Sequence, residues 1–487
     1  MTAEWIGEAP QLHVVWAGSG AVAAVVVTGM ANAAATRAAQ LSATLDGRRV
    51  GAISLPSLAA LDADAMAARI AAFLDNAGGA LPLLVADDLA GGLTALVVPR
   101  LAHAPHKLAL IGRERALRWR KLSPPPGDIR IDGTHLAALW HFLRDLHIDA
   151  EDGEAIPDAA ALSAAFLEAA EDPAAYAALW RMLATLPVPR WDRVTAATEG
   201  GVIFPEPPPG RRRMVDTPRG AMHVRLDGKG QGRPLLLLHH GPGATPVIDD
   251  VILGLGKNRR TIAPDFLGCG RSDKIDAPVT IETLATDMLA LLDALELQTV
   301  DIFGTHTGAF VALQMAIAAP DRIGRVILEG FTPPITADAD AIMRAYPMLA
   351  PAHSGTHLAE AWTMRRDMFR FVPFTTPVRA AQRHLTPAGA SFLHRWTMTL
   401  LHGAPTFRHV MRAAFAYDGA AALAQLTRPA MICAGPEDSL YAGLAATAPI
   451  APACVTIRET PATLWHPAQG RAAIAATLAI YLDFLNG

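Results

Sequence analysis

A short segment near the middle of the chain, residues 301–309, most narrows the structures that this sequence can adopt. It reads DIFGTHTGA, so an apolar run leads into Gly304, and Gly308 opens a helix-forming run behind it. Glycines two residues before and after one position are typical of a sharp strand-to-helix turn, whose central residue takes a positive φ. The central residue is His306. Histidine is among the few non-glycine residues enriched at positive φ, so the sequence predicts a strand, a tight turn and a helix.

The segment after residue 212 alternates apolar runs with helical patterns. Strands are predicted at 234–238, 299–303, 324–328 and 429–434, and helices at 281–295, 308–319 and 468–485. Strands that alternate with helices of this length indicate an α/β fold with a mostly parallel sheet covered on both faces. Between about 335 and 427 the pattern is helical throughout. This block predicts a helical cap inserted into the α/β domain, where a lid would lie.

A proline-rich stretch divides the chain. Residues 205–210 read PEPPPG, which can continue neither a helix nor a central strand. We therefore predict a stiff linker over 205–212. It separates a domain over 1–204 from a domain over 213–487.

The two predicted domains share a sequence pattern. GTHLA occurs at 133–137 and again at 355–359, and each copy is followed at the same distances by a tryptophan and an Arg-Asp pair. This agreement predicts a tandem duplication of one unit, with a helical cap in each copy. The first copy is interpreted as degenerate, because its turn segment at 87–91 reads DDLAG and places Leu89 at the centre. We expect the first copy to be inactive.

Two further motifs accompany the turn at His306. HHGPG at 239–243 follows the first buried strand, and DFLGCGRSD at 265–273 follows the next one. With these motifs, residues 213–487 resemble an α/β-hydrolase with a helical cap, similar to the prolyl-iminopeptidase and epoxide-hydrolase branches. The resemblance implies an acid after a late strand and a histidine after the last one. Asp438 and His466 match these positions, and His306 stands in place of the family's usual serine.

The resemblance also implies an oxyanion loop at HHGPG. Pro242 has no N–H to donate, so Gly241 is the better donor, paired with the backbone amide of Thr307. His240 in the same loop is a candidate substrate-binding residue. The DFLGCGRSD segment is interpreted as a glycine-rich connection closed by an aspartate, in preference to a catalytic element.

The chemistry of His306 leaves several roles open. A neutral imidazole is a competent general base near pH 7, and histidine can also form covalent intermediates. We favour the base role. The spacing of the histidines and Asp438 matches no metal-ligand motif, so neither a metal nor another cofactor is expected. The leading hypothesis is a hydrolase of a small, fairly apolar ester, lactone, epoxide or C–C bond. The alternatives are a cofactor-free lyase, isomerase or oxygenase, or a binding protein without catalytic activity.

Two residues of the predicted cap have competing interpretations. His357 and Trp362 could line a substrate pocket beneath the lid. The same residue types recur as His135 and Trp140 in the copy that lacks a credible site. A motif kept in both copies is more consistent with building the cap.

Composition excludes several classes of protein. The chain has 487 residues, a net charge of −4 and 51% hydrophobic residues, so neither disorder nor a basic nucleic-acid-binding or membrane-binding surface is expected. Its three cysteines cannot form a disulfide framework, which favours a reducing compartment. No apolar run is long enough to span a bilayer. We therefore expect a cytoplasmic protein that binds a small-molecule substrate; its oligomeric state is left open.

Overall fold

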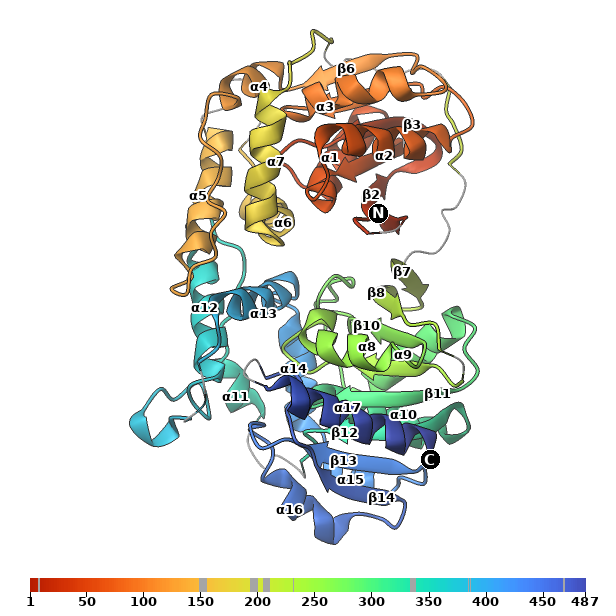
Figure 1. Cartoon of the computed structure of the whole chain (residues 1–487), viewed down its shortest axis with the longest axis vertical. Helices are drawn as coiled ribbons and strands as arrows, with labels where there is room; N and C mark the ends of the chain where they lie inside the picture. The colour runs from red at the N-terminus through yellow and green to blue at the C-terminus, as the bar shows by residue number, and fades with distance from the viewer. Residues whose placement is uncertain are drawn as a thin grey trace. The chain divides into compact units, whose positions relative to one another are not determined.

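The chain divides into two compact units in a computed structural model (Figure 1). The first unit comprises Met1–Arg213 and Pro351–Ala359, and the second comprises Met214–Ala350 and Glu360–Gly487. The structure describes residues 1–7, 9–148, 156–192, 200–204, 211–230, 232–332, 339–383, 385, 387–466 and 469–487. Residues 205–210 of the predicted linker lie outside the described residues.

The first unit is built on a mixed sheet. Its strands are β1 (Thr2–Ile6), β2 (Leu12–Ala17), β3 (Ser19–Val27), β4 (Arg48–Ser54), β5 (Leu84–Asp87) and β6 (Leu108–Ile111). They lie in the order β1-β2-β4-β3-β5-β6. The β3 strand pairs in parallel with β4 and β5, and β5 with β6, whereas β2 runs antiparallel to β1 and β4. Apolar side chains of β3, β4 and β5 form a core with α1, as expected for strands buried on both faces.

Helices flank this sheet. They are α1 (Ala34–Thr44), η1 (Leu55–Leu58), α2 (Ala63–Asp75), α3 (Ala90–Val97), η2 (Val98–Arg100), α4 (Arg113–Trp119), α5 (Thr134–Ile148), α6 (Ala159–Ala170) and α7 (Pro173–Thr185). Three of these helices begin at an aspartate that accepts a hydrogen bond from a first-turn N–H, namely Asp62, Asp158 and Asp172. Such caps satisfy backbone donors that the helix itself leaves open.

The second unit contains a mostly parallel sheet. Its strands are β7 (Arg212–Thr217), β8 (Gly220–Asp227), β9 (Leu235–Leu238), β10 (Thr261–Pro264), β11 (Val300–Thr305), β12 (Ile323–Glu329), β13 (Ala430–Ala434) and β14 (Val455–Glu459). They lie in the order β7-β8-β10-β9-β11-β12-β13-β14. From β10 to β14 in this order, neighbouring strands pair in parallel, whereas β8 runs antiparallel to β10. The predicted α/β class and the predicted buried strands are confirmed.

The helices outside the cap region are η3 (Thr245–Ile248), α8 (Asp249–Leu255), α9 (Ile281–Ala294), α10 (Thr307–Ala318), η4 (Pro320–Arg322), α16 (Gly443–Thr447), η6 (Ala448–Ile450) and α17 (Arg471–Asn486). Between β12 and β13 the chain forms α11 (Ala339–Ala345), α12 (Thr356–Met368), η5 (Arg379–Ala381), α13 (Ala390–His402), α14 (Phe407–Ala416) and α15 (Gly419–Leu423). The described part of the predicted cap is therefore helical, and it contains no named strand. An insertion at this place reaches over the carboxyl ends of the parallel strands, where α/β sheets bind ligands.

Candidate active site

The turn between β11 and α10 holds His306 in the strained conformation that the sequence predicts. Its φ is 50° and its ψ is −112°, and its backbone N–H donates to Glu329 O at 2.9 Å. A Cβ atom on Gly304 would lie 2.1 Å from Gly308 O, and one on Gly308 would lie 2.3 Å from Leu238 O. Only glycine fits at both positions, so the motif is explained by the tightness of the turn.

His306 and Asp438 form a direct pair in this turn. His306 Nε2 lies 3.0 Å from both carboxylate oxygens of Asp438. Asp438 follows β13 and is buried, and its Oδ1 also accepts from Leu440 N at 2.8 Å. Burial alone would lower the pKa of His306, but the adjacent Asp438 carboxylate outweighs burial and raises it. A carboxylate on Nε2 also fixes the tautomer, because the neutral ring then carries its proton on Nε2 and its lone pair on Nδ1.

His466, the third residue of the predicted set, is held differently. Its Nδ1 lies 3.3 Å from Gln469 Nε2, and its ring packs against Phe369 with centroids 5.6 Å apart. Burial lowers the pKa of His466 to about 4, and the Arg383 cation adds to this effect while Asp438 opposes it. His466 is therefore neutral at pH 7. Asp438 is thus hydrogen-bonded to His306, the histidine at the turn. The resemblance to serine enzymes does not suggest this contact.

A cavity of about 520 Å³ opens at His306. Aromatic side chains dominate its wall, among them Phe310, Phe369, Phe374, Phe415, Trp396 and Trp465. The polar groups His240, Thr307 and Arg383 also line it. Its size suits a small organic molecule, and its wall favours an apolar one.

The two proposed oxyanion donors lie in the same wall. Gly241 and Thr307 both line the cavity, and a Cβ atom on Gly241 would lie 3.1 Å from Thr307 Oγ1. Thr307 is the first residue of α10, and the first N–H groups of a helix have no partner inside the helix. The geometry thus places both predicted amides beside His306.

Comparison with known proteins finds a family that matches part of this region. The sequence family described as "alpha/beta hydrolase fold" matches residues 233–356. Most of the matched range lies in the second unit, and it is similar to the α/β-hydrolase fold. A 2-hydroxymuconate semialdehyde hydrolase of Pseudomonas sp. (strain CF600) is 36% identical over 136 residues, 26% of this chain and 48% of that protein. A haloalkane dehalogenase of Mycolicibacterium paratuberculosis (strain ATCC BAA-968 / K-10) is 31% identical over 161 residues, 31% of this chain and 52% of that protein.

Among solved structures, a hydrolase from Pseudomonas aeruginosa PA01 has 23% sequence identity and a TM-score of 0.45. The match covers 57% of this chain and 99% of that one. The chain spans about half the length of the first curated relatives it matches. No helix in the described part of the chain has the length and apolar character needed to cross a bilayer. Within the same ranges, no cluster of His, Cys, Asp and Glu could hold a metal ion.

The glycine-rich turn of the second unit is structural. Buried Asp265 accepts hydrogen bonds from Thr245 N at 2.7 Å and Arg271 N at 2.9 Å, and it pairs with His223 Nδ1 at 2.9 Å. Although burial would raise the pKa of Asp265, the His223 pair outweighs burial and holds it well below its usual range. A carboxylate with this many partners anchors two loops and has no free position for a substrate.

His357 and Trp362 are absent from the residues that line the cavity. His357 belongs to the first unit, where its ring packs edge-on against Trp140 with centroids 4.9 Å apart. His357 Nδ1 accepts from Ala352 N at 3.3 Å, just as His135 Nδ1 accepts from Arg130 N at 3.2 Å. The structure corrects the pocket-lining interpretation of His357. Each of the two histidines instead holds, through a backbone hydrogen bond, the segment that precedes its helix. Trp362 is likewise buried away from the cavity wall.

Several residues at the site carry no sequence signal. Glu329 ends β12 behind His306, its Oε1 accepts from Tyr481 Oη at 2.7 Å, and burial raises its pKa to about 7. Arg383 donates from Nη1 to Met368 O at 3.2 Å while lining the cavity. Trp396 comes from α13 and packs 5.0 Å from the His240 ring. No motif surrounds these residues, so only the folded chain identifies them.

Arg365 ties a cap helix to the predicted oxyanion loop. This fully buried side chain donates from Nη2 to Pro242 O at 2.7 Å and from Nε to Trp396 O at 3.1 Å. Its guanidinium also lies 5.2 Å from the Trp396 ring centroid. The loop that contains Gly241 is therefore positioned from the cap as well as from β9.

For any reaction at His306, we expect Arg365→Met to lower kcat about tenfold, because the loop beside Gly241 loses an anchor and small displacements of catalytic groups are costly. The measurement is steady-state kinetics, with circular dichroism to verify folding. Arg395→Met is the matched control, since Arg395 is an exposed arginine that contacts Phe392 on the same helix. Equal kinetics for the two variants would contradict the anchoring role.

In the first unit, the strained turn contains Asp88 where the sequence predicts Leu89. Asp88 has a φ of 39°, whereas Leu89 has ordinary right-handed helical geometry at −62°. Asp88 N donates to Ile111 O at 2.9 Å, and Gly91 N donates to Asp88 O at 3.1 Å. The turn at His306 has the same pattern, in which His306 N donates to the next strand. The assignment of Leu89 is therefore wrong by one residue.

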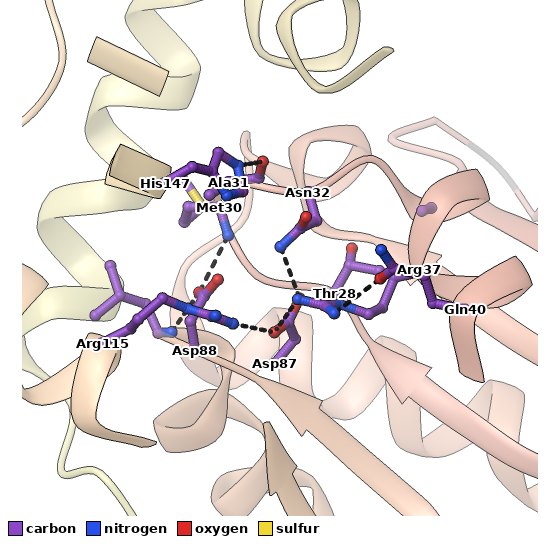
Figure 2. A network of polar contacts seen from close by, with 12 residues as sticks. Thr28, Met30, Ala31, Asn32, Arg37, Gln40, Asp87, Asp88, Arg115 and His147 are labelled. Carbon is purple, nitrogen blue, oxygen red and sulfur yellow. Dashed lines mark hydrogen bonds and ion pairs between the residues drawn. The ribbon is translucent and has the colours of Figure 1, made fainter. Parts of the chain in front are cut away.

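A buried polar network surrounds Asp88 (Figure 2). Asp88 Oδ1 accepts from Met30 N at 3.2 Å and from Leu89 N. The neighbouring Asp87 accepts two hydrogen bonds from Arg37, at 2.8 and 3.0 Å, and one from Arg115 at 3.4 Å. Asp88 is completely buried, and burial followed by the charge of Asp87 raises its pKa to about 8. Asp87 is thus a paired carboxylate and Asp88 a mostly protonated acid at pH 7.

Proposed function

We propose that the second unit hydrolyses a small, largely apolar organic molecule, with His306 as the general base. The observation that carries this proposal is the His306–Asp438 pair at the turn, with His306 lining an aromatic cavity. The fold relationship adds that similar proteins include a 2-hydroxymuconate semialdehyde hydrolase and a haloalkane dehalogenase. Esters, lactones, epoxides and C–C bonds next to a carbonyl are the substrate classes that such a site suits.

The proposed reaction of an ester starts at His306 Nδ1. This nitrogen takes a proton from a water molecule while the water oxygen bonds to the carbonyl carbon, and the carbonyl π electrons move to its oxygen. The resulting imidazolium is stabilised by Asp438, 3.0 Å from Nε2. The amides of Gly241 and Thr307 would bind the oxyanion. When the tetrahedral intermediate collapses, the C–O bond breaks and His306 returns its proton to the leaving oxygen.

Direct attack by His306 is the competing form of the same proposal. In that case Nδ1 bonds to the acyl carbon, the alcohol leaves, and water later cleaves the acyl-imidazole. The test uses p-nitrophenyl acetate and p-nitrophenyl butyrate with the full chain in ¹⁸O-labelled water. We expect nitrophenol release and one ¹⁸O in the acid, with no acyl adduct on the His306 peptide in quenched samples. An adduct would establish direct attack. Absence of turnover with esters, lactones and epoxides alike would overturn the hydrolase proposal.

The pH profile tests the charge of His306. Because Asp438 raises the pKa of His306 although burial opposes it, we expect kcat/KM to fall on the acid side around an apparent pKa above 6.5. In Asp438→Asn the carboxylate is gone and burial dominates, so the acid limb should move below 6.5 while the maximal rate falls. The measurement is kcat/KM for p-nitrophenyl butyrate between about pH 5 and pH 9. If the acid limb has the same apparent pKa in Asp438→Asn as in the wild type, the limb reports the titration of a group other than His306.

We further propose that the two units arose by duplication and that the first, over 1–204, is catalytically silent. In support, the first unit's strand order is repeated in β7 to β12 of the second, and both contain a positive-φ residue at the equivalent turn. The paired roles of His135 and His357 agree with this origin. The predicted acid-and-histidine pair has no counterpart in the first unit's sequence. Its Asp88 carboxyl group already uses the amides that would serve an oxyanion.

A further inference from the structure

One polar group in the cavity wall has no use in the proposed reaction. His240 is 4% exposed and lines the cavity, and its ring packs against Trp396 and Trp465 with centroids 5.0 and 5.7 Å away. Its Nε2 atom is buried and has no hydrogen-bond partner among the described residues. A buried nitrogen without a partner loses the hydration that it would have in water. A ligand that supplies the missing hydrogen bond would recover that loss.

The surroundings of His240 decide whether Nε2 donates or accepts. The His240 ring has a hydrogen bond to the Gly241 backbone, and this bond favours the protonated form of the ring, so Gly241 contributes its carbonyl oxygen. Since Nε2 has no partner, the nitrogen in that bond is Nδ1, which carries a proton. Burial, and then the nearby positive charges of His306 and Arg365, hold the pKa of His240 well below its usual range. A neutral ring with its proton on Nδ1 presents a lone pair at Nε2.

We propose that His240 Nε2 accepts a hydrogen bond from an O–H or N–H group of the substrate, so that the site selects ring-sized apolar molecules that carry such a donor. The inference rests on the proposed function, because it takes the cavity at His306 as the substrate site. The His240 and His306 ring centroids are 6.0 Å apart. This separation places the donor group of the substrate a few bonds from the carbon at which His306 acts. His240 is a specificity residue in this scheme and transfers no proton.

The test measures binding without turnover. The probes are 2-naphthol, which has an O–H donor, 2-methylnaphthalene, which has none, and 2-methoxynaphthalene, which can only accept. Their affinities for the full chain are measured by quenching of tryptophan fluorescence and by calorimetry at pH 7. We expect 2-naphthol to bind about tenfold more tightly than 2-methylnaphthalene, the equivalent of one good hydrogen bond. Tighter binding of 2-methoxynaphthalene than of 2-naphthol would overturn the assignment of Nε2 as an acceptor.

Variants show whether His240 causes the preference. In His240→Phe the two affinities should agree within about twofold, chiefly because 2-naphthol binds less tightly; if this variant does not fold, His240→Leu serves instead. Thr375→Val is the matched control, because it removes another polar group from the cavity wall and should retain the tenfold preference. A preference that survives in His240→Phe contradicts the proposal. Binding is measured at equilibrium and needs no turnover. If the preference for 2-naphthol is absent while ester hydrolysis is intact, only the role of His240 is refuted. Probe selectivity without any hydrolysis would instead refute the proposed reaction.

Discussion

His306→Ala is expected to lower kcat/KM for p-nitrophenyl butyrate by about 10³-fold, which is typical for loss of a general base. The variant removes the group that lines the cavity and pairs with Asp438 at 3.0 Å. It leaves Gly241 and Thr307 in place, so a small residual rate from the amides should remain. Steady-state kinetics on the purified full chain give the measurement, and circular dichroism verifies folding.

Two variants separate this role from a general effect of losing a histidine. His409 pairs with Asp276 at 2.9 Å outside the cavity, so His409→Ala should retain wild-type kinetics. His466→Ala should lower kcat/KM by less than about tenfold, because His306, and not His466, is the base in our proposal. A loss for His466→Ala as large as that for His306→Ala would restore His466 as the base. Turnover unchanged in His306→Ala would place catalysis elsewhere, including in the first unit.

Asp88→Asn is expected to change the stability of the first unit in opposite directions at low and high pH. The folded carboxyl keeps its proton up to about pH 8, whereas the unfolded chain releases it near pH 4. A raised pKa stabilises the folded state fully below the unfolded value, and that stabilisation is lost as the pH rises toward the folded value. Between these limits the wild-type chain loses on the order of 5 kcal/mol, at about 1.4 kcal/mol per pKa unit.

An asparagine does not titrate, so it avoids this loss. It also leaves a buried amide N–H₂ in place of the acid, which costs about 1–3 kcal/mol. We therefore expect Asp88→Asn to be less stable than the wild type near pH 4.5 and more stable near pH 8, measured as the free energy of unfolding in urea. Asp87→Asn is the matched control. Its loss of the Arg37 and Arg115 partners should destabilise the unit by about 3–5 kcal/mol at both pH values. Parallel pH curves for Asp88→Asn and the wild type would contradict the raised pKa.

The turns at His306 and Asp88 show which local features can be predicted from sequence patterns. At His306 the flanking Gly304 and Gly308 identify both the turn and its central residue, because no larger residue fits. In the first unit the matching glycines are missing, and Gly91 shifts the apparent motif by one residue to Leu89. Positive φ at Asp88 is tolerated because aspartate, like histidine, enters this region more readily than most residues. The residue type alone could not show which of the adjacent Asp87 and Asp88 takes the positive φ.

Contacts between residues that are far apart in the sequence could not be predicted in the same detail. Chain order and resemblance identify Asp438 as the acid, but they cannot determine which of His306 and His466 it contacts, since both follow strands of one sheet. The position of Arg365 depends on how a helix more than a hundred residues away from Pro242 packs in three dimensions. The GTHLA repeat, by contrast, could be interpreted from the sequence as structural, and both of its histidines accept a backbone hydrogen bond from a residue just before a helix.

The carboxyl group of Asp88 acts as a tethered competitor. It is covalently attached next to the amides of Met30 and Leu89, so its effective concentration there exceeds that of any dissolved hydrogen-bond acceptor. An incoming substrate would have to displace a ligand that cannot diffuse away. We thus expect the first unit to show no catalytic activity at any attainable substrate concentration. Raising the substrate concentration would not reveal a weak activity in it. We therefore expect its inactivity to follow from an occupied site as much as from any group that it lacks.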